Sequence, residues 1–411
     1  MRVSPRSIGA RLRRLLGPDA ASVGQGLAAL LVSSGGDLLA GLTLGAITHT
    51  LENLPGLLVL VPAAIGMRGN IFGALGSRLG TTIHTGTFRL SRRADTVVGQ
   101  NVLASLSLTF SVSLALAVLA KAVAVGFGLS HTISIAVFVV ISVVGGVVSS
   151  IVVLALTLGV AAGSVRFGWD MDNVAAPLVT AAGDVVTLPS LFAATVLVRV
   201  TLVTPILGVI LTVLATLSLI GAFRAGLPLL ARIVRESLPV LLVAGTIDVV
   251  AGITIEKRLG SFLVFPALLV LIPPFLEDAG ALGGILSSRI ASKLHLGVVD
   301  PVAVPQRAAR SDFLLTFVFA VPVFVLVALS SDVAASASGL RSPGSLDMVA
   351  VSLLGGFVAT VFAVIVAYYG AIATFRLGLD PDNHGIPMVT SSMDLLGAFA
   401  LILAIVIVGI A

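Results

Sequence analysis

Long, nearly uninterrupted apolar runs are the feature of this sequence that most limits its fold. Hydrophobic residues make up 57% of the 411 residues and charged residues only 10%, whereas soluble domains carry about a quarter charged residues. Each run has roughly 20 residues or more, which lets one helix cross about 30 Å of hydrocarbon. The Ala, Val, Leu and Gly content favours helices over a β-barrel, whose strands alternate polar and apolar residues. The sequence therefore predicts an all-α polytopic protein, integral to the lipid bilayer.

About eleven transmembrane helices are expected, as two sets of five with one helix between them. The first set is predicted at residues 26–50, 54–77, 99–124, 133–164 and 174–198. The second set is predicted at residues 238–258, 262–287, 311–331, 347–374 and 384–411. Five helices alone would invert the second set in the membrane, so an intervening linker helix makes the two sets parallel. The predicted organisation is a basic segment at 1–25, a first repeat at 26–200, the linker helix at 201–223 and a second repeat at 238–411.

The distribution of Arg and Lys predicts the orientation of the chain. If the N-terminus is cytoplasmic, most basic residues fall in cytoplasmic loops, as the positive-inside rule requires. Five fall outside: Lys121, Arg199, Lys257, Arg258 and Arg341. The C-terminus is then extracellular, and the plasma membrane is the expected location. Because the basic residues report orientation, the net charge of +5 does not indicate nucleic-acid binding, and the absence of Cys excludes thiolate metal sites.

A duplicated segment supports the two-repeat interpretation. Residues 170–184 recur 210 positions later as residues 380–394, with seven of fifteen positions identical. The identical pairs are Asp170/Asp380, Asp172/Asp382, Asn173/Asn383, Pro177/Pro387, Val179/Val389, Thr180/Thr390 and Asp184/Asp394. An offset of 211 aligns other residues: Asp37 with Asp248, Pro55 and Pro62 with Pro266 and Pro273, Ser77-Arg78 with Ser288-Arg289, and His84 with His295. Substrate sites commonly form at the interface between such repeats.

Two aspartates of this duplication are the strongest candidates for a functional role. Asp184 and Asp394 lie about three turns inside apolar runs, where an ionised group is costly. The spacing Pro-x-x-Thr-x-x-x-Asp places Thr180 with Asp184, and Thr390 with Asp394, on one helix face. Carboxylate, hydroxyl and proline-freed carbonyl oxygens suit a hard divalent cation, and Mg²⁺ keeps much of its water, so few ligands suffice. We expect the two carboxylates to face each other across one polar cavity. The alternative is a buried aspartate that a neighbouring helix satisfies or that is held neutral.

Further acidic residues lie in other apolar runs. Asp37 and Asp248 stand about ten residues into the first helix of each set, and Glu277 and Asp278 end the apolar part of the run at 262–287. The matching positions of the first repeat carry no acid: Gly66 and Met67. We interpret Asp37, Asp248 and Glu277 as residues that line an entrance or a second ion site. The alternative is that Asp37 and Asp248 pair with arginines or cap helix ends.

Polar residues near the cytoplasmic surface have less specific interpretations. Four aspartates at the start of the fifth and eleventh helices could attract cations or cap the helices: Asp170, Asp172, Asp380 and Asp382. Arg78 and Arg289 are expected to anchor their helices at the interface rather than to bind the ion. The basic N-terminal segment is either a helix on the membrane surface or a disordered tail.

Three motifs resemble a known family. Pro-Ala-Ala-Ile-Gly-Met-Arg-Gly-Asn at 62–70, with Ser-Arg-Leu-Gly-Thr at 77–81, resembles the first signature of the solute carrier 41 and MgtE magnesium transporters. The segment at 280–295 resembles its second copy, and Asp-Pro-Asp-Asn…Pro-x-Val-Thr-x-x-x-Asp is similar to the motif of the family's last helix. The resemblance covers about residues 26–411. It implies the five-helix MgtE membrane domain, present twice in one chain.

The resemblance also implies roles for particular residues. The pore aspartate of the family's last helix corresponds to Asp184 and Asp394, and the glycine–asparagine signature corresponds to Gly69 and Asn70. Bacterial MgtE forms one pore from two chains, so the resemblance implies that this chain forms a pseudo-dimer alone or a homodimer. The cytoplasmic sensor domains of bacterial MgtE have no counterpart in the sequence, so gating through them is not expected.

We therefore expect transport of Mg²⁺, or of a related divalent cation, through a central pathway between the repeats. No cofactor and no enzymatic activity are expected. A channel and an exchanger that uses Na⁺ as coupling ion both fit the sequence. One alternative is a proton- or Na⁺-coupled transporter of another ion or small solute. Another is an intramembrane aspartyl protease, but its Gly-x-Gly-Asp signature is matched only in its last two residues, at Gly183-Asp184.

Overall fold

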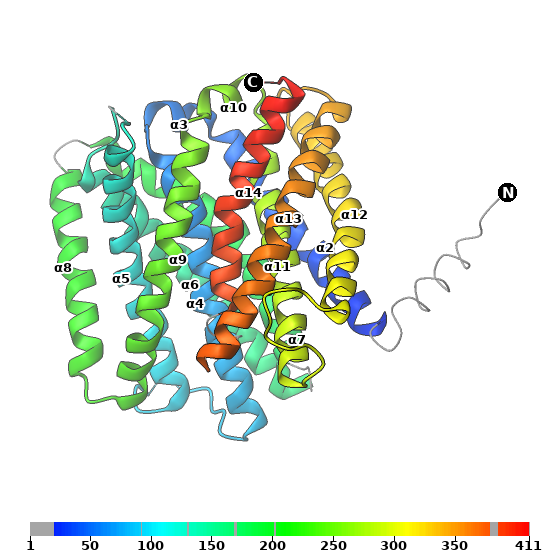
Figure 1. The fold of residues 1–411 in the computed structure, drawn as a ribbon. Coiled ribbons are helices and arrows are strands. Elements are labelled where there is room, and N and C mark those ends of the chain that lie inside the picture. Colours follow the sequence, from blue (N-terminus) through cyan, green and yellow to red (C-terminus); the bar gives the residue numbers. More distant parts are fainter. Residues whose placement is uncertain are drawn as a thin grey trace.

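The computed structural model describes residues 20–91, 93–129, 131–167, 171–200, 203–378 and 385–410, and these form a bundle of helices (Figure 1). The first half contains α2 (Ala20–Ala46), α3 (Thr48–Asn53), α4 (Leu57–His84), α5 (Val97–Gly126), α6 (Ile135–Phe167), α7 (Met171–Thr195) and the short helix η2 (Val196–Arg199). After α8 (Val203–Arg224), the second half contains α9 (Pro228–Glu256), α10 (Leu259–Val264), α11 (Ala267–His295), α12 (Arg307–Ala337), α13 (Ser345–Leu377) and α14 (Ile386–Val408).

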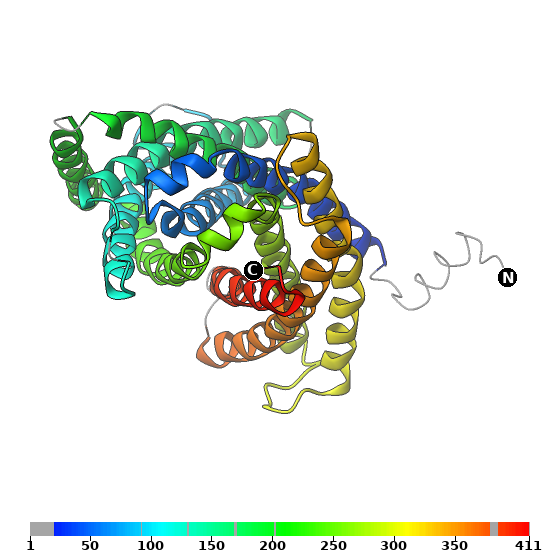
Figure 2. The same ribbon diagram turned by 90° about the horizontal axis from the view of Figure 1, so that it is seen from above.

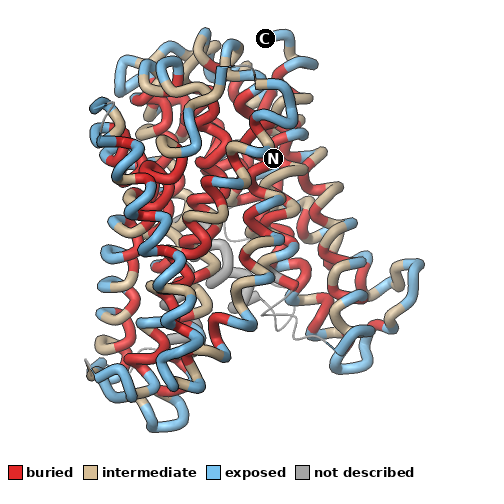
Figure 3. Tube along the Cα trace, turned by 90° about the vertical axis from the view of Figure 1, so that its left-hand side faces the viewer, coloured by how far each residue is buried: buried red, intermediate tan, exposed pale blue. Residues whose placement is uncertain are grey.

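Ten of the described helices are long and apolar enough to cross a membrane. The 27-residue helix α2 corresponds to the expected first span. The chain is thus an all-α polytopic membrane protein, as the apolar runs predict. Buried residues extend through the interior of the bundle and exposed ones concentrate at its ends (Figure 3). Several expected features lie outside the described residues or side chains: the segment at 1–19, and Asp170, Asp172, Asp380 and Asp382.

Several predicted helix boundaries were wrong, and α9 shows the physical reason. It begins at Pro228, ten residues before the expected start. Proline is favoured in the first turn, where its missing N–H is not needed. Gln100 accepts hydrogen bonds from the backbone N–H groups of Leu229 and Leu230, at 3.1 and 3.2 Å, and so satisfies two donors at the helix start. The first turns of α9 therefore form outside the apolar run that hydropathy detects.

The two halves exchange their first helices. α2 packs against α11 of the second half, while α9 packs against α4 and α5 of the first half (Figure 2). Glycines permit both close contacts. A side chain at Gly41 of α2 would collide with the Val270 carbonyl of α11, and one at Gly252 of α9 would collide with the Val59 carbonyl of α4. These contacts repeat with a sequence offset of 211, so the interface between the halves has approximate two-fold symmetry.

Helix α8 lies at the edge of the bundle, where it packs against α5 and α6 (Figure 1). Its outer face carries exposed apolar side chains, among them Ile206, Val209 and Val213. Such a face suits contact with lipid. At the centre, α4 and α11 are the most buried of the spanning helices, and several buried carboxyl groups lie on or near them.

Candidate functional site

The first acidic pair joins α2 to α7. The carboxyl groups of Asp37 and Asp184 approach to within hydrogen-bonding range, and both residues are buried, with exposed fractions of 0% and 2%. Both carboxylate oxygens of Asp37, and Oδ2 of Asp184, lack a hydrogen-bond partner in the described structure. Two facing carboxylates offer only acceptors, so a proton or a cation must lie between them.

The second acidic pair joins α9 to α14 at the corresponding positions. The carboxyl groups of Asp248 and Asp394 also approach to within hydrogen-bonding range. Asp248 is fully buried, and both of its oxygens lack a partner in the described structure. Asp394 is partly exposed. Asp184 and Asp394, which we expected to face each other across one polar cavity, lie close enough to interact electrostatically. Each also approaches the aspartate in the first helix of its own repeat to within hydrogen-bonding range.

Two acidic residues of α11 lie beside these pairs. Glu277 is partly exposed and lies within electrostatic range of Asp184 and Asp248, which belong to different pairs. Asp278 is buried and points toward α2, where the Ser34 hydroxyl donates to its two carboxylate oxygens at 3.0 and 2.9 Å. Glu277 therefore faces the space that both pairs share, while Asp278 helps to hold α2 against α11.

Small residues keep the surroundings of the pairs open. A Cβ at Gly66 of α4 would lie 3.1 Å from Asp248 Oδ2 and 3.7 Å from Asp394 Oδ2. Thr180 lies against Gly69 of α4, because a Cβ at that glycine would be 4.0 Å from its Oγ1. At the corresponding position of the second half, Thr390 lies against Gly280 of α11. Both threonines are partly exposed. Backbone and hydroxyl groups, rather than bulky side chains, thus face the centre at this level.

A partly exposed stripe runs along the otherwise buried helix α4. Gly66, Asn70 and Gly73 follow one another at spacings of four and three residues, and the stripe ends at the exposed Ser77. A Cβ at Gly73 would meet no atom within 4 Å. Gly66 on this stripe faces the second acidic pair, so the stripe connects that pair with the C-terminal end of α4 through partly exposed positions. Asn70 lies on the stripe, but no contact described in the structure joins it to either pair.

The described residues contain no group of three or more His, Asp or Glu side chains arranged to enclose a metal ion. The carboxylates are instead distributed as two pairs with Glu277 between them. This arrangement cannot replace the whole hydration shell of a small cation. It can bind the outer oxygens of a hydrated one, as Mg²⁺ sites in proteins commonly do.

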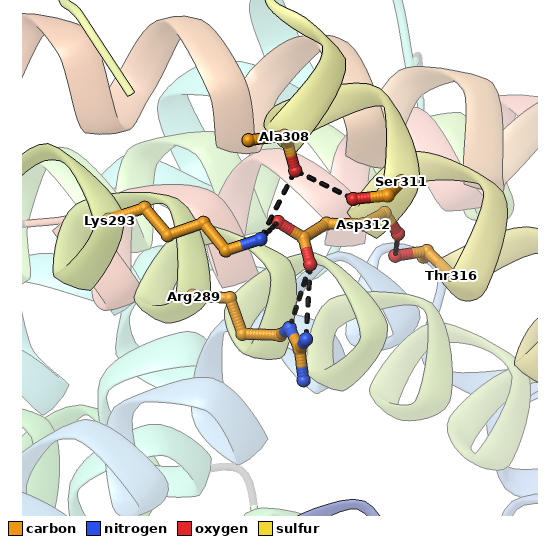
Figure 4. Close-up of polar contacts among 6 residues, drawn as sticks. All are labelled: Arg289, Lys293, Ala308, Ser311, Asp312 and Thr316. Carbon is orange, nitrogen blue, oxygen red and sulfur yellow. Dashed lines mark hydrogen bonds and ion pairs between the residues drawn. The ribbon is translucent and has the colours of Figure 1, made fainter. Parts of the chain in front are cut away.

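Arg78 and Arg289 lie away from the acidic pairs, toward the C-terminal ends of α4 and α11. Arg289 Nε and Nη2 donate to Asp312 Oδ1 at 3.2 and 3.1 Å, and Lys293 Nζ donates to Oδ2 at 2.6 Å (Figure 4). In the first half, Arg78 Nε donates to Asn101 Oδ1 at 2.7 Å. Both arginines join neighbouring helices, so these contacts give them a structural role.

Two features of the site were missed by sequence reasoning. Gly66 faces an acidic pair directly, and Ser34 binds Asp278. The repeat alignment contains a signal for the first, because Gly66 stands at the position of Glu277. No sequence signal identifies the second, since Ser34 and Asp278 are 244 residues apart.

The chain is similar to known proteins over most of its length. A family model, MgtE, described as divalent cation transporter, matches residues 61–194 and again residues 272–404, together more than half of the chain. Solute carrier family 41 member 3 of Rattus norvegicus is 26% identical over 394 residues, which cover 91% of this chain and 84% of the relative. Solute carrier family 41 member 2 of Homo sapiens is 25% identical over 401 residues, covering 92% and 69%. No solved structure matches the chain.

Proposed function

This chain belongs to the MgtE family of divalent cation transporters, and from that premise we propose that it moves Mg²⁺, or a closely related divalent cation, along the centre of the bundle. The pathway runs between α4, α7, α11 and α14, past the two acidic pairs. The ion is the cargo, and the chain needs no resident cofactor or catalytic group for this activity.

The observation that carries the proposal is the pair of donor-free carboxyl contacts. Asp37 and Asp248 are fully buried, yet none of their four carboxylate oxygens has a partner in the described structure. Uncompensated buried carboxylates are costly unless a cation or a proton accompanies them. The pairs lie near Glu277 and the partly exposed stripe of α4. In this proposal the negative charge attracts the cation, and the stripe lets the cation retain bound water.

The residues act on a hydrated ion in this proposal. Asp184 and Asp394 attract and position it, while Thr180 and Thr390 offer hydroxyl oxygens to its water. Mg²⁺ releases water reluctantly, so contacts through water allow passage without full dehydration. Both pairs come from one chain, so a single chain forms the complete pathway. The membrane potential contributes about 2.3 kcal/mol per charge per 100 mV, and about twice that for a divalent ion, which is sufficient to drive uptake.

Ion flux into proteoliposomes tests the proposal. The purified chain is reconstituted, and uptake of Mg²⁺ is compared with that of Ca²⁺, Mn²⁺ and Co²⁺, with and without a Na⁺ gradient. We expect Mg²⁺ uptake by the wild type and a loss of at least about tenfold in Asp184→Asn and in Asp394→Asn, because each removes a charge that contacts the ion. Dependence on the Na⁺ gradient would identify an exchanger, and independence a channel.

The control is Asp95→Asn, which removes an aspartate whose partner Arg93 is also exposed, in the loop between α4 and α5. It should leave uptake unchanged. Undiminished Mg²⁺ flux in both pathway variants would rule out the ion-site assignment. Absence of divalent cation flux in the wild type would rule out the function.

A further inference from the structure

An apolar groove opens on the outer surface of the bundle between α2 and α7. Leu39 and Leu42 of α2 form one wall, Val185 and Pro189 of α7 form the other, and the loop between α12 and α13 contributes Leu340. The groove has a volume of about 470 Å³, which falls within the range of roughly 300–1,000 Å³ that is typical of small-molecule sites. It is therefore large enough to bind part of a lipid-sized molecule.

The loop that contributes to the groove is fixed by contacts with two helices. The backbone N–H of Ala267 in α11 donates to the Arg341 carbonyl at 3.1 Å. The Leu340 side chain packs closely against α2, since a Cβ at Gly45 would lie 2.8 Å from its Cδ1. The groove is thus formed by the fold itself, before any molecule binds to it.

The symmetry-related place on the bundle is bridged by larger side chains. Ala46 of α2 and Ser338 of the loop also line the groove. Their counterparts at an offset of 211 are Lys257 and Phe127, and Lys257 Nζ lies 5.2 Å from the centroid of the Phe127 ring. A lysine and an aromatic ring therefore meet where the groove has only a methyl and a hydroxymethyl group, so the small side chains of Ala46 and Ser338 keep the groove open.

The groove extends from the hydrocarbon region to a membrane surface. Helices α7, α12 and α13 are spanning helices, so the loop between α12 and α13 lies at a membrane surface, at the end of the bundle where α2 also ends (Figure 1). Arg341, next to Leu340, is exposed there. Asp332 accepts hydrogen bonds from the hydroxyls of Ser342 and Ser345, and no acidic side chain of the described residues forms an ion pair with Arg341. Apolar walls with a cation at one end complement an amphipathic anion.

We propose that this groove binds an anionic phospholipid, with one acyl chain between α2 and α7 and the phosphate beside Arg341. An acyl chain gains no hydrophobic free energy on moving from the bilayer into the groove, so its affinity depends on packing and on the charge of the headgroup. The lipid contacts both helices that carry the first acidic pair and stabilises their packing. This inference goes beyond the proposed function and does not depend on which ion the chain carries.

Native mass spectrometry of the purified whole chain in detergent tests the charge. The probes are phosphatidylglycerol, which is anionic, and phosphatidylcholine with the same acyl chains, which is zwitterionic. We expect phosphatidylcholine to bind about fivefold more weakly, the contribution of one basic residue near a membrane surface. Arg341→Gln should weaken phosphatidylglycerol by the same factor and so remove the preference. Arg224→Gln, at an exposed position at the end of α8, is the matched control and should retain it.

A filled groove tests the place of binding. Ala46→Lys combined with Ser338→Phe gives the groove the two residues that stand at the symmetry-related place. We expect phosphatidylglycerol to bind at least about tenfold more weakly, because the acyl chain loses its packing contacts. The added lysine attracts an anion, so a loss of binding identifies steric closure. Val209→Phe, which adds a ring to the exposed outer face of α8, is the control and should leave binding unchanged.

Three outcomes would contradict the inference. Equal binding of the two lipids by the wild type, or undiminished binding of phosphatidylglycerol by the filled variant, would mean that lipid binds without a specific site. A wild type that elutes as a dimer, with a filled variant that elutes as a monomer, would assign the groove to an interface between two copies of the chain. Variants are compared only when their thermal unfolding in detergent matches that of the wild type, and Ser338→Phe alone replaces the double variant if the latter unfolds.

Discussion

The interiors of the two halves share a backbone contact but differ in the side chains around it. In the first half, the Ser142 hydroxyl of α6 donates to the Ser113 carbonyl of α5 at 2.7 Å. In the second half, the Ser352 hydroxyl of α13 donates to the Phe324 carbonyl of α12, also at 2.7 Å. These bonds occupy equivalent positions in the two repeats. The residue whose carbonyl accepts the bond is the small polar Ser113 in the first half and the large aromatic Phe324 in the second.

The difference extends to the central helix of each half. Arg68 of α4 is 1% exposed, and its Nη2 donates to Ser113 Oγ at 3.2 Å. The position equivalent to Arg68 in α11 is Ala279. In the second half the ring of Phe324 lies against Gly356, whose counterpart Gly146 borders Arg68 in the first half, and its centroid lies 5.0 Å from that of Phe275. A long and a short side chain have thus exchanged places across the helix interface. Duplicated backbones can be retained when such changes in size compensate each other.

The C-terminal ends of α4 and α11 have surroundings that differ in charge. Asp312 is 3% exposed and compensates Arg289 and Lys293 together. Its counterpart Asn101 is neutral and accepts one hydrogen bond from Arg78. The second half therefore uses an ionic contact where the first uses a neutral one. Taken with Glu277, the comparison shows that the repeats have kept their packing geometry while their charges have diverged.

The largest effect on this comparison is expected from Phe324→Ala. It removes a buried aromatic side chain and leaves a cavity between α11 and α12, so the free energy of unfolding should fall by about 3–5 kcal/mol. The matched change in the first half, Ser113→Ala, removes one hydroxyl and should cost about 1 kcal/mol. Both are measured by titration with a denaturing detergent in mixed micelles. Equal losses would show that the two interiors do not depend on different side chains.

A smaller effect is expected at the C-terminal ends of α4 and α11. Asp312→Asn leaves Arg289 and Lys293 without their carboxylate, and unfolding should become easier by about 1–3 kcal/mol, since both cations are partly exposed and can recover water. Asn101→Asp introduces a carboxylate opposite Arg78 and should stabilise the first half by up to about 1 kcal/mol. Both changes in the free energy of unfolding should become smaller when the titration is repeated at high salt, because salt screens the charges. A stabilising effect of Asp312→Asn, or a destabilising effect of Asn101→Asp, would contradict the assignment of an ionic contact to one half only.

Much of the fold follows from hydropathy, because the membrane imposes a length and a composition on every span. Hydropathy does not detect helical turns that extend into water, which explains why α9 begins at Pro228, before the charged residues Arg232, Arg235 and Glu236. The exchange of α2 and α9 between the halves was also not predictable from apolar runs. It depends on which surfaces permit close approach, as at Gly41 and Gly252.

The candidate site, like the fold, could be predicted only in part from the sequence. A carboxylate inside an apolar run is rare and costly, so Asp37, Asp184, Asp248 and Asp394 could each be selected from sequence. Their pairing could not, because it depends on how helices distant in sequence cross. The sequence predicted that Asp184 and Asp394 face each other across one polar cavity, and it predicted no partner for either in the first helix of its repeat. The structure places each within hydrogen-bonding range of the aspartate in that helix.

The smallest effect is expected from Arg68→Met, which tests the polar interior of the first half. Nε and Nη1 of Arg68 have no partner in the described structure, so its buried charge is poorly compensated. An apolar side chain of similar length should leave the free energy of unfolding unchanged or raise it by about 1 kcal/mol, because the cost of burying the guanidinium disappears. Arg68→Ala is the control: it removes the same charge but leaves a cavity, and should be less stable than Arg68→Met by about 2 kcal/mol. A loss above about 1 kcal/mol in Arg68→Met would mean that the buried guanidinium stabilises the first half, contrary to this expectation.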